Sequence, residues 1–178
     1  MENQFSLLNK EQLSLKNREV FKKVEKNFGK VPNLYNVIAY SEHALDAYIK
    51  LEETPNSLTP KEVEAVNLVV SQVNQCLYCL SAHTIIARST GITEEDSREI
   101  RLGKFSAEEK IDALVKLTEQ ITLNRGHVKN NALEKFFEMG YTKENLVDLI
   151  LLIGDRTISN LLYAVTQVPI DFPIAKSV

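Results

Sequence analysis

The stretch Thr59–His83, TPKEVEAVNLVVSQVNQCLYCLSAH, decides the fold class of this chain. It opens with Thr59, Pro60 and Glu62, a side-chain cap, a proline in the first turn and a glutamate at the third helical position. Apolar side chains then recur at the spacing of an amphipathic helix, at Val63, Val66, Val70 and Val73. We therefore predict a helix that leads into the cysteine-containing end of the stretch.

That end holds both cysteines of the chain, Cys76 and Cys79, and His83 four residues after the second. If the segment is helical, Cys79 and His83 lie one turn apart on one face. A thiol needs a nearby base to become a thiolate at neutral pH, and a thiolate needs a partner thiol to discharge oxidation as a disulfide. The spacing therefore predicts thiol redox chemistry, with His83 as the base for Cys79.

Two other interpretations of the cysteine pair remain open on spacing alone. Cys-x2-Cys-x3-His offers three zinc ligands, and a fourth would have to come from His43, His127 or a carboxylate elsewhere. The pair could also be two buried, inert cysteines. Tyr78, between them, either hydrogen-bonds a peroxide oxygen or packs its ring.

Outward from this stretch, nearly every segment predicts a helix. One is expected to stop at Gly29, and Ser106 with Glu109 predicts a capping box for a long helix over 107–125. Thr142 is expected to cap the last long helix, from Lys143 to about residue 167. No alternating strand pattern competes. We predict an all-α fold of seven to nine helices, in one compact domain spanning residues 1–178.

Composition agrees with an ordinary globular protein of 178 residues, 44% of them hydrophobic. The formal charge of −3 gives no electrostatic reason to expect nucleic acid. The apolar run Leu146–Ile153 contains Asp148, so it is too short and too charged for a bilayer span and predicts a buried helix. Asp155 and Arg156, directly after it, are interpreted as structural residues that pair with one another's neighbours across a subunit contact.

The chain starts Met-Glu-Asn-Gln, without a basic region followed by an apolar one, so no secretory signal is visible. We expect a cytoplasmic protein with no membrane partner. In a reducing compartment a Cys-x2-Cys pair is more often catalytic or metal-binding than a structural disulfide.

At this point the residues resemble a known family, the alkylhydroperoxidase D-like group of the carboxymuconolactone decarboxylase superfamily. Its redox members carry a glutamate, eleven residues, and then Cys-x2-Cys-x3-His, as Glu64, Cys76, Cys79 and His83 do here. The flanking residues 31–35 (VPNLY) and 160–173 agree with it as well. In the founding hydroperoxidase type a histidine stands where this chain has Tyr78. The decarboxylase branch lacks the cysteine pair.

The resemblance implies an alkylhydroperoxidase D-like fold, assembly as a homotrimer or homohexamer, and reduction of organic hydroperoxides without a cofactor or metal. In the predicted cycle Glu64 orients His83, and His83 helps to deprotonate Cys79. The thiolate attacks the peroxide and becomes a sulfenic acid, and Cys76 condenses with it to a disulfide. An external dithiol or thiol protein then restores the pair. Tyr78 is the expected substrate contact.

Three alternatives are kept. Cys76, nearer the helix start, could be the attacking cysteine instead. The chain could also be a zinc-binding module, or a redox-sensing assembly protein without significant turnover.

Overall fold

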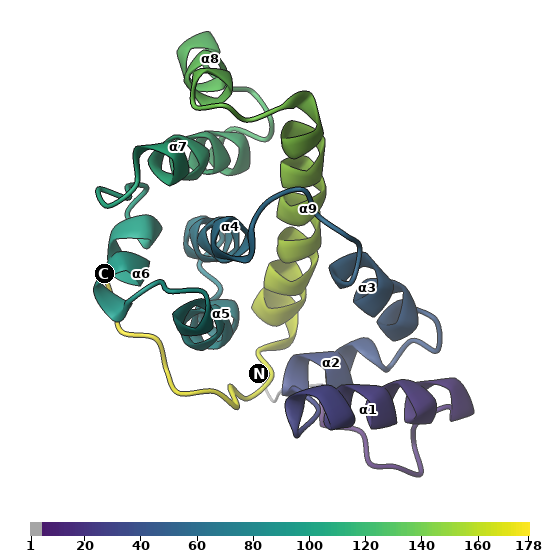
Figure 1. Cartoon of the computed structure of the whole chain (residues 1–178). Helices are drawn as coiled ribbons and strands as arrows, with labels where there is room; N and C mark the ends of the chain where they lie inside the picture. Colours follow the sequence, from purple (N-terminus) through teal and green to yellow (C-terminus); the bar gives the residue numbers. More distant parts are fainter. Residues whose placement is uncertain (1–4) are drawn as a thin grey trace. The chain divides into compact units, whose positions relative to one another are not determined.

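The computed structural model describes residues 5–178, apart from the side chain of Phe28, and folds there into nine α-helices without a strand (Figure 1). The helices are α1 (Leu15–Phe28), α2 (Asn33–Ile38), α3 (Ala44–Glu52), α4 (Pro60–Val73), α5 (Leu77–Ser89), α6 (Glu94–Arg101), α7 (Glu109–Leu123), α8 (Asn130–Glu138) and α9 (Lys143–Thr166). The predicted all-α class is confirmed.

Two compact units make up the described chain. The first contains the residues up to Thr54 together with Leu162–Asp171, and the second contains Pro55–Leu161 together with Phe172–Val178. The prediction of one domain over 1–178 stays a prediction. The start of the chain, Met1–Gln4, on which the absence of a secretory signal was judged, lies outside the described residues.

The first unit packs α1, α2 and α3 around a small apolar cluster that includes Val20, Val24, Leu45 and Tyr48. Gly29 ends α1 as predicted, because its φ of 74° is a left-handed conformation that glycine adopts without strain. The buried side chain of Asn17 donates to the carbonyl oxygens of Ala39 and Ser41, at 2.8 and 3.1 Å. These bonds fix the start of α1 to the α2–α3 turn.

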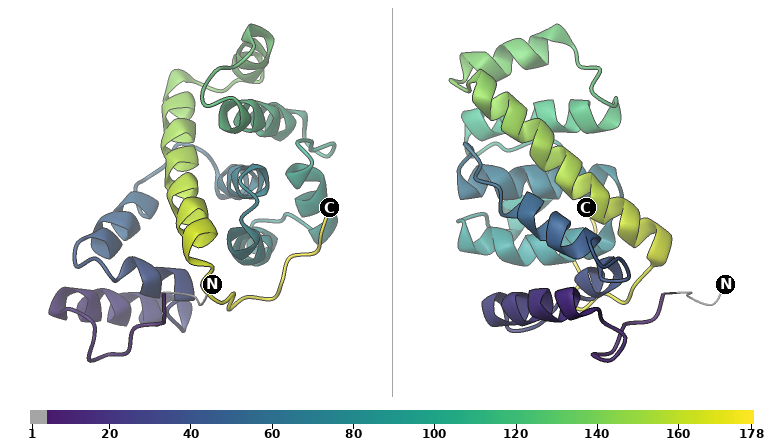
Figure 2. Two further views of the ribbon diagram at one scale, coloured as in Figure 1. Left: turned by 180° about the vertical axis from the view of Figure 1, so that it is seen from behind. Right: turned by 90° about the vertical axis from the view of Figure 1, so that its right-hand side faces the viewer.

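The second unit is built around α4, which lies between α5 and α7 in both views (Figures 1 and 2). The predicted capping box is present, because Thr59 Oγ1 accepts the Glu62 amide while the Glu62 carboxylate accepts the Thr59 amide. Two apolar clusters flank α4. Leu68 and Val69 pack with side chains of α5, α6 and α7, whereas Val66 and Val70 pack with those of α7, α8 and α9. The polar side chains of α4 are therefore held in the interior.

The start of α7 contradicts the predicted capping box. Ser106 gives both its hydroxyl and its backbone amide to the Glu99 carboxylate, and Glu108, without a side-chain cap, occupies the N-cap position of α7. The prediction failed because a carboxylate from α6 competes for the same serine.

The predicted buried helix over 146–153 is only half buried. Leu149 and Ile153 face the core, but Val147, Ile150 and Leu151 are exposed. They belong to α9, whose 24 residues are long and apolar enough for a membrane span by length and composition, a property that core helices share. Thr142 precedes α9 as predicted, and its hydroxyl accepts the Asn145 amide at 3.2 Å.

Candidate dithiol site

Cys76 and Cys79 lie at the start of α5, as the spacing predicts. After α4 the chain reverses through Gln75, whose φ of 55° is left-handed, and this turn puts Cys76 at the N-cap of α5. The Cys76 sulfur accepts the backbone N–H of Cys79 at 3.2 Å. Both cysteines are free thiols, 1% and 2% exposed. The pair is thus a buried dithiol at a helix N-terminus.

His83 follows Cys79 by one turn of α5 and meets Glu64 of α4. Its Nδ1 lies 2.8 Å from Glu64 Oε2, and Asn67 Nδ2 donates to Glu64 Oε1 at 3.0 Å. Burial favours a raised pKa for Glu64, but the electrostatic effect of His83 and the hydrogen bonds from His83 and Asn67 lower this pKa overall. An ionised Glu64 accepts a hydrogen bond from Nδ1–H of His83, and this tautomer leaves Nε2 of His83 free to act as a base.

Helix α9 contributes a group of polar side chains to the site that sequence reasoning missed. The Cys79 thiol lies 3.7 Å from Ser159 Oγ, and Arg156 Nη1 donates to the same oxygen at 3.2 Å. Arg156 Nε donates to Asn67 Oδ1 at 3.2 Å. A continuous chain of contacts therefore runs from Cys79 through Ser159, Arg156 and Asn67 back to Glu64.

The interpretation that Asp155 and Arg156 pair with one another's neighbours across a subunit contact is wrong in its placement. Both side chains are buried within the chain, and Arg156 Nη2 lies 3.3 Å from Asp155 Oδ2. Two adjacent charges in an otherwise apolar helix were the available signal, because charged side chains are buried mainly where they have partners to satisfy.

The two thiols differ in acidity because of what surrounds each. The hydrogen bond from the Cys76 thiol, then the electrostatic effects of Arg156 and His83, outweigh burial and lower the pKa of Cys79 to about 6. The same thiol–thiol hydrogen bond, burial and the charge on Cys79 raise the pKa of Cys76. The hydrogen bond from the backbone N–H of Cys79 lowers the pKa of Cys76. The effect of this one amide is weaker than that of the charge beside Cys79. Cys79 is therefore the thiolate of the pair.

Cys76 lies beside a second group of polar side chains. Asn160 hydrogen-bonds its thiol, accepts from Asn74 Nδ2 at 3.0 Å and lies 3.4 Å from the Ser71 hydroxyl. Tyr78, between the cysteines, is buried, and its ring packs edge-on against Phe172 with the centroids 5.5 Å apart. Its expected contact with substrate stays a prediction.

The zinc alternative requires a fourth ligand beside Cys76, Cys79 and His83. Within residues 5–178 no three histidine, cysteine, aspartate or glutamate side chains are grouped as a metal site, and the imidazole of His83 is engaged with Glu64. The exposed His43 and His127 do not join the cysteines in such a group.

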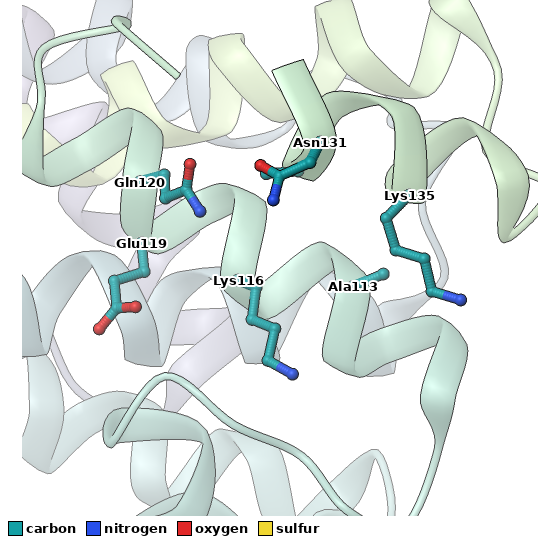
Figure 3. Close-up of a pocket in the computed structure, with 7 residues that line it drawn as sticks. Ala113, Lys116, Glu119, Gln120, Asn131 and Lys135 are labelled. Carbon is teal, nitrogen blue, oxygen red and sulfur yellow. The ribbon is translucent and has the colours of Figure 1, made fainter. Parts of the chain in front are cut away.

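A pocket of about 240 Å³ lies away from the thiols, between α7 and α8 (Figure 3). Lys116, Glu119 and Gln120 line it from α7, and Asn131 and Lys135 from α8. Both lysines already pair with carboxylates, Lys116 with Asp112 and Lys135 with Glu109. None of the predicted site residues lines this pocket.

A protein-family model and one relative each match part of this chain. The model of the carboxymuconolactone decarboxylase family matches residues 40–118, which contain Glu64, Cys76, Cys79 and His83. The uncharacterized protein YdfG of Bacillus subtilis (strain 168) is 34% identical over 95 residues, 51% of this chain and 63% of YdfG. The match thus spans less than two thirds of that relative.

Solved structures share the fold at lower identity. The alkylhydroperoxidase AhpD core of a peroxidase-related protein from Ralstonia eutropha JMP134 has a TM-score of 0.84 at 20% identity, over 94% of this chain and 91% of that one. A peroxidase-related protein from Silicibacter sp. TM1040 gives 0.79 at 17%, over 95% and 92%. The debrominase Bmp8, bound to 2,3,4-tribromopyrrole, gives 0.79 at 16%, over 96% and 93%.

The fold, the family motif and the four motif residues that the structure brings together agree with one another. Residues 40–118 match the carboxymuconolactone decarboxylase family, and the chain has the all-α fold of solved peroxidase-related structures, one of them an alkylhydroperoxidase AhpD core.

Proposed function

We propose that this chain is a thiol-dependent peroxidase that reduces organic hydroperoxides through a Cys76–Cys79 dithiol/disulfide cycle. The observation that carries the proposal is a buried dithiol whose second cysteine lies one turn before a histidine paired with a carboxylate. The contacts of Arg156 and Ser159 with the Cys79 side of the pair support it further.

In the proposed cycle His83 Nε2 accepts the Cys79 proton, directly or through a water molecule. The thiolate attacks the terminal oxygen of ROOH, the O–O bond breaks, and the leaving alkoxide takes a proton to become ROH. Cys79 is then a sulfenic acid. The Cys76 sulfur attacks the Cys79 sulfur, the disulfide forms, and water leaves. An external dithiol or thiol protein reduces the disulfide by exchange.

Each neighbouring side chain has a separate role in this scheme. Glu64 fixes the tautomer of His83, and Arg156 with Ser159 stabilises negative charge on the Cys79 sulfur. Tyr78 stands where the founding type has a histidine, so in this chain the proton relay consists of Glu64 and His83 alone. We propose Tyr78 as the substrate contact beside the thiols. The cytoplasmic location, and the absence of cofactor, metal, nucleic-acid and membrane partners, stay predictions.

The test uses metal-stripped protein and a slight excess of cumene hydroperoxide. Intact mass and free-thiol counts should show the loss of two thiols and about two mass units, reversed by dithiothreitol. In Cys76→Ser, dimedone should trap a sulfenic acid on Cys79. If both thiols survive the peroxide, the proposal fails. A sulfenic acid on Cys76 in Cys79→Ser would reverse the proposed order of the cysteines.

Turnover separates the enzyme from the redox-sensing alternative. Sustained consumption of hydroperoxide with excess dithiothreitol supports a peroxidase, whereas consumption that stops after one equivalent supports a sensor. Since a protein of the same fold is a debrominase, the assay also supplies 2,3,4-tribromopyrrole as a second electron acceptor. Faster oxidation of the dithiol by the bromopyrrole than by the hydroperoxide would move the proposal to reductive dehalogenation.

A further inference from the structure

The outer face of α9 is apolar from Val147 to Leu161, after the exposed Lys143 and Glu144 of its first turn. Every residue of α9 that is exposed between positions 147 and 161 is apolar or glycine: Val147, Ile150, Leu151, Gly154, Ile158 and Leu161. Their large side chains are 42–68% exposed. We call this set the α9 stripe. A continuous apolar surface of this kind is typical of an interaction site on a folded chain.

Gly154, in the middle of the α9 stripe, indicates what kind of surface covers the stripe. Only proline disfavours a helix interior more than glycine does, so a mid-helix glycine needs a reason. Apart from the adjoining residues and backbone of α9 itself, a Cβ added at Gly154 would meet no described atom within 4 Å. The chain itself therefore does not require glycine there. Close approach of another backbone at this point would require it.

The α9 stripe is also nearly symmetric about Gly154. Ile150 and Ile158 lie four residues on either side, and Val147 and Leu161 lie seven residues on either side. An antiparallel copy of the same helix, crossing at Gly154, places Ile150 of each copy against Ile158 of the other. No charged side chain lies on the stripe, so this pairing brings no like charges together.

We propose that the α9 stripe is the contact between two copies of this chain, related by a two-fold axis that passes at Gly154. A surface that pairs with itself in this way is isologous. The proposal does not depend on the proposed peroxidase function. It adds a constraint to the expected homo-oligomer, because a hexamer with two-fold axes contains such a contact and an isolated cyclic trimer does not.

The size of the stripe sets the expected strength of the contact. It exposes on the order of 400 Å² of apolar surface per copy, about half of the ~800 Å² per partner in a stable interface. The stripe alone therefore makes a dimer whose population depends on protein concentration, unless further surface joins it in a larger assembly.

The first experiment measures the mass of the full chain by light scattering and sedimentation velocity over a hundredfold range of concentration. Wild type should reach an even multiple of the chain mass, and Ile158→Glu should halve it or leave monomer. The matched control, Leu123→Glu, changes a comparably exposed leucine at the end of α7 and should behave as wild type. A wild type that stays monomeric throughout, or an Ile158→Glu variant with the wild-type mass, overturns the proposal.

The second experiment tests the axis. In a Cys76→Ser/Cys79→Ser background, Gly154→Cys should form a disulfide-linked dimer under mild oxidation, because a residue on a two-fold axis meets itself. Ile158→Cys, which faces position 150 instead, should form it at least tenfold more slowly. Equal rates contradict the two-fold pairing. A second outcome also contradicts the pairing. If monomeric wild type co-sediments with phosphatidylcholine vesicles and Ile158→Glu does not, lipid covers the α9 stripe.

Discussion

The two faces of α9 are built in opposite ways. The face toward the core carries four buried polar residues, Asp155, Arg156, Ser159 and Asn160, beside the apolar Leu149 and Ile153, whereas the outer face carries only the apolar side chains of the α9 stripe. An amphipathic surface helix usually shows the reverse, with its apolar side chains inward and its charges in water.

The difference shows that two requirements orient this helix. Burying a guanidinium and a carboxylate is costly unless they are paired and hydrogen-bonded, and here the buried polar residues bring Arg156 within reach of Ser159 and Asn67. Exposing aliphatic side chains is costly unless something covers them. The inner face therefore belongs to the thiol site, and we assign the outer face to a second copy.

The largest effect is expected where the inner face is broken. Arg156→Met removes the cation 3.3 Å from the buried Asp155 carboxylate, so the free energy of unfolding should fall by about 3–5 kcal/mol in urea at pH 7. The double variant Asp155→Asn/Arg156→Met removes the buried negative charge as well and should recover part of the loss. Equal losses in the single and double variants would show that the ion pair is not the cause.

A second effect concerns the acidity of Cys79. In wild type the rate of alkylation of Cys79 by iodoacetamide should be half-maximal near pH 6, in keeping with its lowered pKa of about 6. Arg156→Lys keeps the charge but loses the two-sided hydrogen bonding to Ser159 and Asn67, and Ser159→Ala loses one contact with the thiol. We expect both to raise the midpoint, by about one unit or 1.4 kcal/mol.

The control for this shift is Arg101→Met, which removes another buried arginine that bonds Gln72 and the Lys176 carbonyl. Its alkylation midpoint should stay at the wild-type value.

The lowered pKa of Cys79 also makes the stability of the fold depend on pH. A thiolate stabilises the fold fully above its unfolded pKa of about 8.5, and this contribution is lost as pH falls through about 6. Wild type should therefore gain more stability than Ser159→Ala between pH 6 and pH 8.5.

On the outer face the expected effects are smaller and depend on concentration. Because association stabilises the folded chain, the melting temperature of wild type should rise by about 2 °C for each tenfold increase in protein concentration. Ile158→Glu should abolish this dependence. Differential scanning calorimetry at three concentrations measures it, and a concentration-independent wild type would remove the case for pairing at the α9 stripe.

The smallest expected effect tests whether Gly154 is required by the chain itself or by the contact with a second copy. In the Ile158→Glu background, where the stripe is expected to be free, Gly154→Ala should add about 0.5–1 kcal/mol to the free energy of unfolding. The added methyl group meets no described atom outside the adjoining part of α9, and alanine has the higher helix propensity. In an otherwise wild-type chain the same change should weaken the dimer. A loss of stability in the monomeric background would mean that the chain itself needs this glycine.

The parts of the fold that sequence predicted are those that neighbours along the chain determine. Thr59 and Glu62 cap α4 across a single turn, and Gly29 ends α1 through its own backbone conformation. Ser106 shows the limit of this reasoning. Its capping box had the right residues at the right spacing, but the Glu99 carboxylate took the serine. A competitor seven residues back on another helix leaves no signal in the local pattern.

The residues of the site also divide into those that the local sequence predicted and those that it did not. Cys79 and His83 share a helix, so their spacing alone placed them one turn apart. Glu64, on another helix, was found only through the family resemblance, and its contact with His83 joins residues 19 apart. Arg156 and Ser159 lie about 80 residues beyond the cysteines and belong to no local motif, so their roles were missed.

By itself, the sequence determined the helical class, the dithiol and its neighbouring base, because a helix repeats every 3.6 residues and caps act within one turn. Only the tertiary structure decided which face of α9 turns inward. That choice depends on where α4 and α5 place Asn67 and Cys79, and on the free energy of pairing a buried arginine with them. It adds the charge of Arg156 to the thiol–thiol hydrogen bond that lowers the pKa of Cys79, and it leaves an apolar stripe on the outside.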